Sequence, residues 1–137
     1  MQIPTLSELC EIFIRPPRLS YSLNQLGEPR FKVQVPSGGG ATYDIKRDDF
    51  AVTNPNSNCK LFCSLYNAEN NPFEDCVIFL HGSSGGRPQA INLVHKVLSM
   101  KLAICCFDFS GCGMSEGKYI TLGWKEKDDL ETVYKEL

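Results

Sequence analysis

Two short apolar runs, each followed by a glycine-rich loop, constrain the fold of this chain most. The first is CVIFLHGSSGG at Cys76–Gly86, and the second is LAICCFDFSGCGMSEG at Leu102–Gly117. Continuous apolar runs of this length predict strands that are buried on both faces. A helix-length segment separates them, which is typical of two parallel strands joined by a helix. The sequence therefore predicts an α/β fold in this part of the chain.

Antiparallel strands are expected before these runs. Phe31–Val35, Tyr43–Val52 and Lys60–Tyr66 contain β-branched and aromatic residues, and turn residues separate them. They predict an antiparallel meander that leads into two parallel strands, Cys76–Leu80 and Ala103–Phe109.

The N-terminal segment predicts a short amphipathic helix. Apolar residues recur at helical spacing in Pro4–Ile14, and two prolines at Pro16–Pro17 stop the helix. We expect this helix to pack on the edge of its own domain. The alternatives are contact with a membrane or a partner, and Cys10 is a weak candidate for lipidation.

Two later segments predict helices that follow the buried strands. One begins at Pro88 and continues to Met100. In the other, Thr121 can cap a helix that continues to Leu137. Its charged side chains are expected to face solvent, where Lys125 and Asp129 can pair. The apolar side chains expected to face the core are Trp124, Leu130, Val133, Tyr134 and Leu137.

Length and charge exclude several classes of protein. A chain of 137 residues can form one domain with its own core. The net formal charge is −2, and no basic stripe is present to neutralise phosphates, so no nucleic-acid partner is expected. The sequence also lacks the pattern of a secretory leader and a long apolar stretch, so it gives no firm indication of a membrane.

Cysteine usage favours the cytoplasm. The count of seven is odd, and most of the cysteines lie inside apolar runs, where a thiol behaves as a small hydrophobic side chain. No C-x-x-C pair with metal-ligand spacing occurs, so no metal site is expected.

The two loops resemble those of the α/β-hydrolase superfamily. The residues that carry this resemblance are HGSSGG at 81–86 and DFSGCGMSEG at 108–117. Within the superfamily, the chain is similar to serine-aminopeptidase-like hydrolases, whose members include peptidases, esterases, lipases and acyl-protein thioesterases. Three further phrases resemble the same group, namely PPR at 16–18, RDDFAVTN at 47–54 and LGWKEKDDL at 122–130. The resemblance covers nearly the whole chain but only the first half of such a hydrolase.

The resemblance implies a fold that is the N-terminal half of an α/β-hydrolase. Residues 1–30 would form an N-terminal amphipathic helix and extension. Residues 31–137 would form a partial hydrolase domain with strands 1–4 and the first two helices, and without the nucleophile elbow. In this topology Val77–Leu80 is central, with Ala103–Phe109 on one side and an absent fifth strand on the other. The implied partner is the rest of the hydrolase domain or a neighbouring subunit that covers this open edge.

The resemblance also assigns roles in the first loop. The residue after His-Gly supplies a backbone N–H to the oxyanion hole, which is Ser83 here, with Ser84 as the alternate. Gly82 lets the backbone turn and approach a substrate closely. His81 is expected to act as a hydrogen-bonding group at the strand end rather than as a base. No cofactor is implied.

The second loop is expected to support the site. Asp108 would hold the loop by accepting hydrogen bonds from backbone N–H groups. Gly111, Gly113 and Ser115 belong to the same structural loop.

Two letter patterns in the second loop suggest other functions. Gly113–Gly117 matches G-x-S-x-G, which would make Ser115 a nucleophile. However, Ser115 lies six residues beyond the strand end at Phe109, and no histidine follows it, as the fold requires. The glycines at 111, 113 and 117 resemble a dinucleotide fingerprint, but their spacing is one residue too long. We therefore predict neither role.

Two functional hypotheses remain. The favoured one is the front portion of a serine hydrolase that acts on an ester, thioester or amide. The chain itself would be inert, because the catalytic triad is expected beyond Leu137. The alternative is a non-catalytic, hydrolase-derived component of a larger assembly.

Overall fold

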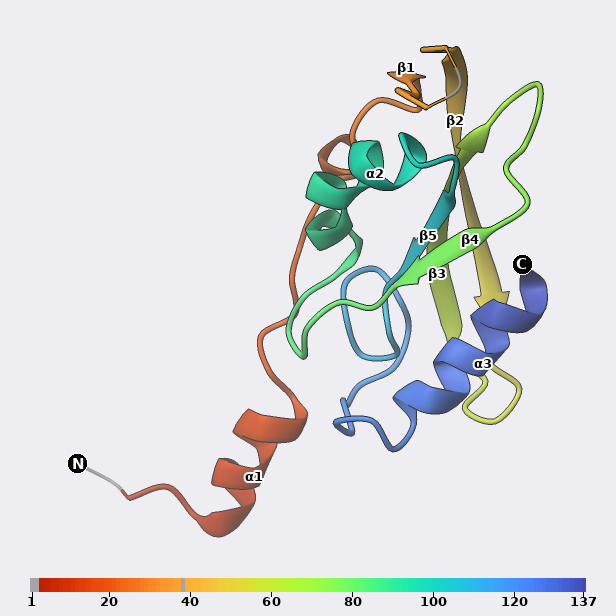
Figure 1. The fold of residues 1–137 in the computed structure, drawn as a ribbon. Coiled ribbons are helices and arrows are strands. Elements are labelled where there is room, and N and C mark those ends of the chain that lie inside the picture. Colours follow the sequence, from red (N-terminus) through yellow and green to blue (C-terminus); the bar gives the residue numbers. More distant parts are fainter. Residues whose placement is uncertain (1–2, 38) are drawn as a thin grey trace.

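The computed structural model describes residues 3–37 and 39–137, so residues 1 and 2 of the expected N-terminal segment lie outside it. The described strands form a single mixed sheet in the order β1-β2-β3-β5-β4 (Figure 1). The strands are β1 Arg30–Gln34, β2 Thr42–Thr53, β3 Lys60–Ala68, β4 Cys76–Phe79 and β5 Ala103–Phe107. The α-helices are α1 Leu6–Ile14, α2 Ile91–Leu98 and α3 Glu126–Glu136, with short 3₁₀ turns at Leu23–Leu26 and Arg87–Ala90.

The pairing of the strands confirms the predicted α/β fold class. β1, β2 and β3 form an antiparallel meander, and β3 pairs with β5 in the antiparallel sense. β4 and β5 are parallel, with Cys76 opposite Ala103 and Phe79 opposite Cys106. The described sheet has five strands.

Helices cover both faces of the sheet. Every residue of β5 is buried, and successive side chains point to opposite faces. Ile104 and Cys106 contribute to the core beneath α2, whereas Cys105 and Phe107 contribute to the core beneath α3. This arrangement places the ends of β4 and β5 between two helical layers.

β4 is less buried than predicted. Cys76 and Val77 are exposed, and Leu80 just beyond the strand is 46% exposed. The cause is the sheet order, because β4 is the outermost strand and has a described neighbour only in β5. The prediction that Cys76–Leu80 is buried on both faces is therefore wrong for this chain.

α3 also differs from the prediction. It begins at Glu126 rather than near Thr121, because residues 121–125 form a separate turn in which the Thr121 hydroxyl accepts a hydrogen bond from Lys125 N. Val133 is buried as expected and packs with Leu130. Trp124, Tyr134 and Leu137 are exposed instead of facing the core.

α1 does not pack on the domain, contrary to expectation. Thr5 and Glu8 form a capping box that begins the helix, and the helix contains no buried residue. Figure 1 shows α1 extending away from the sheet and its two covering helices. The amphipathic helix is therefore present, but its predicted docking is wrong. Within residues 3–37 and 39–137, no helix is long and apolar enough to cross a membrane.

Candidate active site

The two loops lie together at the ends of the parallel strands. They border a cavity of about 310 Å³ beyond the carboxyl ends of β4 and β5. Its lining is mostly apolar and includes Leu80, Phe109, Cys112, Ile120 and Leu122. Clefts in α/β folds lie at this end of a parallel sheet. The cavity is therefore a candidate substrate site.

Ser83 and Ser84 occupy an exposed turn, and Ser83 lines this cavity. The turn is closed by a hydrogen bond of 2.9 Å from Gly85 N to Gly82 O. Gly82 N donates to the side-chain oxygen of Gln89 at 3.1 Å, so the turn is also tied to the start of α2. Neither the Ser83 nor the Ser84 backbone N–H donates a hydrogen bond to another described residue. Both donors are therefore free to bind a ligand.

His81 uses both of its ring nitrogens within the protein. Nε2 accepts a hydrogen bond of 3.0 Å from Phe109 N, which places the proton on Nδ1. Nδ1 then donates to Gly82 O at 2.6 Å. The imidazole therefore links the ends of β4 and β5 and has no nitrogen left to accept a proton from a substrate.

Asp108 connects the two loops. Its Oδ1 atom accepts a hydrogen bond of 2.7 Å from Arg87 N, and its Oδ2 atom accepts one of 2.9 Å from Met114 N. The Tyr21 hydroxyl donates to Oδ2 at 2.5 Å. Burial, together with this bond to Asp108, raises the pKa of Tyr21, so the phenol stays protonated as a donor. One buried carboxylate thus joins the first loop, the second loop and the N-terminal segment.

Gly113 is required where the second loop passes the Asp108 carboxylate. Its φ is +49°, and a Cβ atom at this position would collide with Asp108 Cγ. We expect Gly113→Ala to lower the free energy of unfolding by about 1–3 kcal/mol through this clash. Urea midpoints from pulse proteolysis would measure the change.

Gly123→Ala is the matched control for Gly113→Ala. Gly123 also has a positive φ, +110°, but a Cβ atom added there would meet no other atom within 4 Å. The control should show only backbone strain of about 1 kcal/mol. Equal losses in the two variants would contradict the close contact with Asp108.

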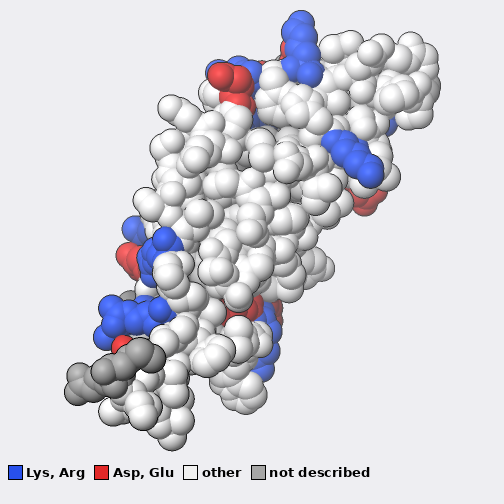
Figure 2. All heavy atoms as spheres, turned by 90° about the vertical axis from the view of Figure 1, so that its left-hand side faces the viewer, with Lys and Arg blue, Asp and Glu red and all other residues white. Residues whose placement is uncertain are grey.

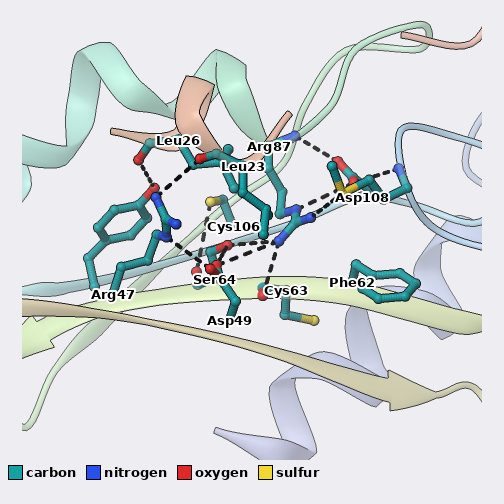
Figure 3. A network of polar contacts seen from close by, with 12 residues as sticks. Leu23, Leu26, Arg47, Asp49, Phe62, Cys63, Ser64, Arg87, Cys106 and Asp108 are labelled. Atoms are coloured by element: carbon teal, nitrogen blue, oxygen red, sulfur yellow. Dashed lines mark hydrogen bonds and ion pairs between the residues drawn. The ribbon is translucent and has the colours of Figure 1, made fainter. Parts of the chain in front are cut away.

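Arg87 is the main site residue that sequence reasoning missed. Its side chain is 1% exposed and donates to Ser64 Oγ at 2.8 Å and to the Tyr21 hydroxyl at 2.7 Å. Its Nε atom lies 3.4 Å from Asp108 Oδ2. Asp49 lies 3.8 Å from Arg87 and also pairs with Arg47 at 3.1 Å (Figure 3). The available signal in the sequence was a single arginine between Gly86 and Pro88, at the end of the first glycine-rich loop.

Asp129 is the second omission, and its predicted exposure is wrong. It is fully buried rather than paired with Lys125 at the surface. Its carboxylate accepts hydrogen bonds from Asn54 Nδ2 at 2.6 Å, from Ser110 N at 2.8 Å and from Ser110 Oγ at 2.9 Å. The Asp129 carboxylate therefore joins three segments of the chain, namely RDDFAVTN, DFSGCGMSEG and LGWKEKDDL. The three phrases are distant in sequence, so only the folded chain shows their connection.

Arg18 explains the structural role of the PPR motif at residues 16–18. Its Nη1 atom donates to Ser115 O at 2.8 Å, and its Nη2 atom donates to Gly117 O at 2.6 Å. A guanidinium suits this contact because its fixed fork can bind two carbonyl groups at once. The N-terminal extension therefore holds the far end of the second loop.

Ser115 and Cys112 do not present activated nucleophiles. Ser115 is fully buried, and its hydroxyl donates to Asp108 O at 2.6 Å and accepts from Phe62 N at 2.9 Å. Burial raises the pKa of the Cys112 thiol to about 11, so this thiol is protonated at neutral pH. Among the residues that the structure describes, no cluster of three or more His, Cys, Asp or Glu side chains is arranged to hold a metal ion.

The fold matches part of an esterase. Solved structures of the esterase Pf2001 from Pyrococcus furiosus superpose on this chain in three crystal forms. The first has a TM-score of 0.64 and 26% identity over 91% of this chain, and the second has a TM-score of 0.62 and 26% identity over 89%. The third has a TM-score of 0.60 and 24% identity over 90%.

The match covers less than half of the esterase. This chain spans 42%, 41% and 40% of the three esterase chains. Comparison with protein-family models and with curated proteins gives no match. The likeness therefore supports a hydrolase-derived fold that corresponds to part of an esterase domain.

Proposed function

We propose that this chain is the front portion of a serine hydrolase of the serine-aminopeptidase-like group, acting on an ester, thioester or amide in the cytoplasm. The unpartnered N–H groups of Ser83 and Ser84, at the rim of an apolar cavity, are the observation that carries this proposal. The nucleophile, the catalytic acid and the catalytic histidine come from sequence beyond Leu137. The likeness to an esterase supports the hydrolase class.

The proposed role of the serine turn is to stabilise an oxyanion. Two adjacent backbone donors that are already oriented need no reorganisation as negative charge develops on the substrate oxygen. Two hydrogen bonds hold this turn in place. One joins Gly82 to Gln89, and the other joins His81 to Phe109. The lining of the cavity next to it is mostly apolar, and electrostatic contacts are stronger in surroundings of low dielectric constant.

Reaction with a fluorophosphonate probe tests this proposal. We expect the 137-residue chain to remain unlabelled, whereas a longer polypeptide that contains it is labelled at a serine beyond Leu137. Ser115→Ala in the longer polypeptide should leave labelling intact, because the Ser115 hydroxyl is buried and bonded on both sides. Labelling of Ser115 itself would show that the G-x-S-x-G letters do mark the nucleophile.

The alternative remains a non-catalytic component of a larger assembly. His81 and Ser115 are both committed to internal hydrogen bonds, which is compatible with this alternative and with the favoured hypothesis. A longer polypeptide that folds but is never labelled by the probe would favour this alternative.

The open edge of the sheet requires a partner under either hypothesis. β4 has pairing partners described only on its β5 side, and Val77 within this strand is exposed. Unpaired strand edges associate with other chains. We propose that the rest of the hydrolase domain, or a neighbouring subunit, covers this edge.

The same edge predicts the behaviour of the isolated chain. Residues 1–137 alone should sediment as larger species rather than as a stable monomer, because β4 leaves a row of N–H and C=O groups without partners. Analytical ultracentrifugation with urea unfolding would measure this. A monomer with a sharp cooperative transition would contradict the prediction.

A further inference from the structure

α1 has an apolar face that no described residue covers. Leu6, Leu9, Cys10 and Phe13 recur at three- and four-residue spacing, so they lie on one side of the helix. Glu8 and Glu11 lie on the other side. Ile3, Leu6 and Phe13 are 89%, 78% and 70% exposed. An apolar surface of this kind on an extending helix calls for a partner.

A basic groove lies at the C-terminal end of the same helix. The groove has a volume of about 470 Å³ and is lined by Arg15, Arg18 and Lys118 together with Pro16, Pro17 and two glycines. Arg18 is bonded to backbone carbonyls, whereas Arg15 and Lys118 form no ion pair with another residue in the described ranges. Figure 2 shows Lys and Arg side chains near the lower end of this face, with Asp and Glu side chains among them, and further charged side chains at the upper end.

Hydrogen bonds connect the end of α1 to the groove. Ile120 N donates to Ile14 O at 2.8 Å, at the last residue of α1. Arg18, three residues after Arg15, is anchored to the second loop through Ser115 O and Gly117 O. The last residue of α1 therefore lies beside the basic groove.

We propose that α1 binds the surface of an anionic membrane. Its apolar face enters the boundary between headgroups and acyl chains, while Arg15 and Lys118 contact lipid phosphate and carboxylate groups. Interfacial helices combine these two features, and the cytoplasmic leaflet carries the anionic lipids that a basic groove attracts. The helix is nine residues long, so it lies on the membrane and does not span it.

The size of α1 argues against a second copy of the chain as the occupant. A stable protein interface buries about 800 Å² on each partner. One face of a helix about 13 Å long offers only a fraction of that area. A lipid surface has no such requirement, because insertion of a few large apolar side chains and attraction of basic groups act together.

Vesicle flotation tests the proposal. A longer polypeptide that contains this chain, and in which the open edge of β4 is covered, is mixed with vesicles of phosphatidylcholine alone or of phosphatidylcholine with phosphatidylserine. It is then floated through a density gradient, so unbound protein stays at the bottom. We expect flotation with the anionic vesicles that weakens at high salt. Phe13→Glu should lower the fraction bound at least tenfold, since it places a charge on the inserted face.

Two further variants separate the contribution of the basic groove to membrane binding from the contribution of the apolar face of α1. Arg15→Glu combined with Lys118→Glu should lower binding to anionic vesicles at least about 25-fold, because each basic group lost costs about fivefold and each new carboxylate adds repulsion. Met100→Glu adds a carboxylate, as Phe13→Glu does, at an apolar position just after the end of α2 that is 61% exposed, and it should leave flotation unchanged.

Three outcomes would overturn the proposal. The first is equal flotation with neutral and anionic vesicles. The second is an equal loss of vesicle binding in Phe13→Glu and Met100→Glu. The third is a Phe13→Glu variant whose sedimentation changes while its flotation does not. The last would show that α1 contacts a second copy of the chain. Because no step involves the serine turn, the result is independent of the proposed hydrolase function.

Discussion

Ser83→Pro lowers the turnover of a hydrolase that contains this chain by about 10²–10³-fold, which is the cost of losing one oxyanion donor. Proline removes the backbone N–H that Ser83 leaves without a partner at the cavity rim. The loss should fall on kcat more than on KM, because the oxyanion develops only as the reaction proceeds. Steady-state hydrolysis of a chromogenic ester would measure both constants.

Ser83→Ala is the matched control, since alanine keeps the backbone N–H and removes only an exposed hydroxyl. Its turnover should stay close to that of the unchanged protein. Ser84→Pro distinguishes the alternate donor. If Ser84→Pro abolishes turnover while Ser83→Pro does not, the assignment moves to Ser84, and if neither variant changes kcat, the oxyanion role of this turn is wrong.

Asp108→Ala lowers the free energy of unfolding by about 3–5 kcal/mol, as expected when one partner of a buried ion pair is removed. The substitution leaves Arg87, whose side chain is 1% exposed, without its buried counter-ion. It also leaves Met114 N and the Tyr21 hydroxyl without their acceptor. Total stabilities of domains are only about 5–15 kcal/mol, so this loss is a large share. Urea midpoints from pulse proteolysis would measure it.

Asp48→Ala is the control for Asp108→Ala. Asp48 pairs with Lys46 at the surface, where both side chains are about half exposed. Removal of such a pair changes stability by less than about 1 kcal/mol. We also expect Arg87→Met and Asp108→Ala to be less than additive, because both remove the same contact. Additive losses would show that the two residues act separately.

The fold was predictable because its signals are local. Alternation and continuous apolar runs identified all five strands, and the order of apolar runs and helices indicated the parallel pair β4 and β5. The burial of individual side chains could not be predicted from these local signals. Val77 and Trp124 are apolar in sequence but exposed in the structure, because their exposure depends on which elements lie beside them.

The candidate site was predictable only in part. Ser83, His81 and Asp108 lie just after strands, within sequence motifs that resemble those of a known superfamily. By contrast, Arg87 and Asp129 each resemble surface charges in sequence. Their burial follows from partners far away along the chain, such as Ser64 for Arg87 and Asn54 for Asp129. Polar side chains that satisfy one another over such separations leave no periodic signal.

The double contact of Arg18 has a consequence for synthesis of the protein. Arg18 binds carbonyl groups 97 and 99 residues further along the chain. A ribosome that adds about 5–20 residues per second needs about 5–20 s to produce these partners after Arg18 itself. Throughout that interval the N-terminal segment has no fixed position, although α1 can already form with its own capping box. This N-terminal segment is thus among the last parts of the chain to be held in place, and its apolar helix is exposed to the surroundings before the domain has folded.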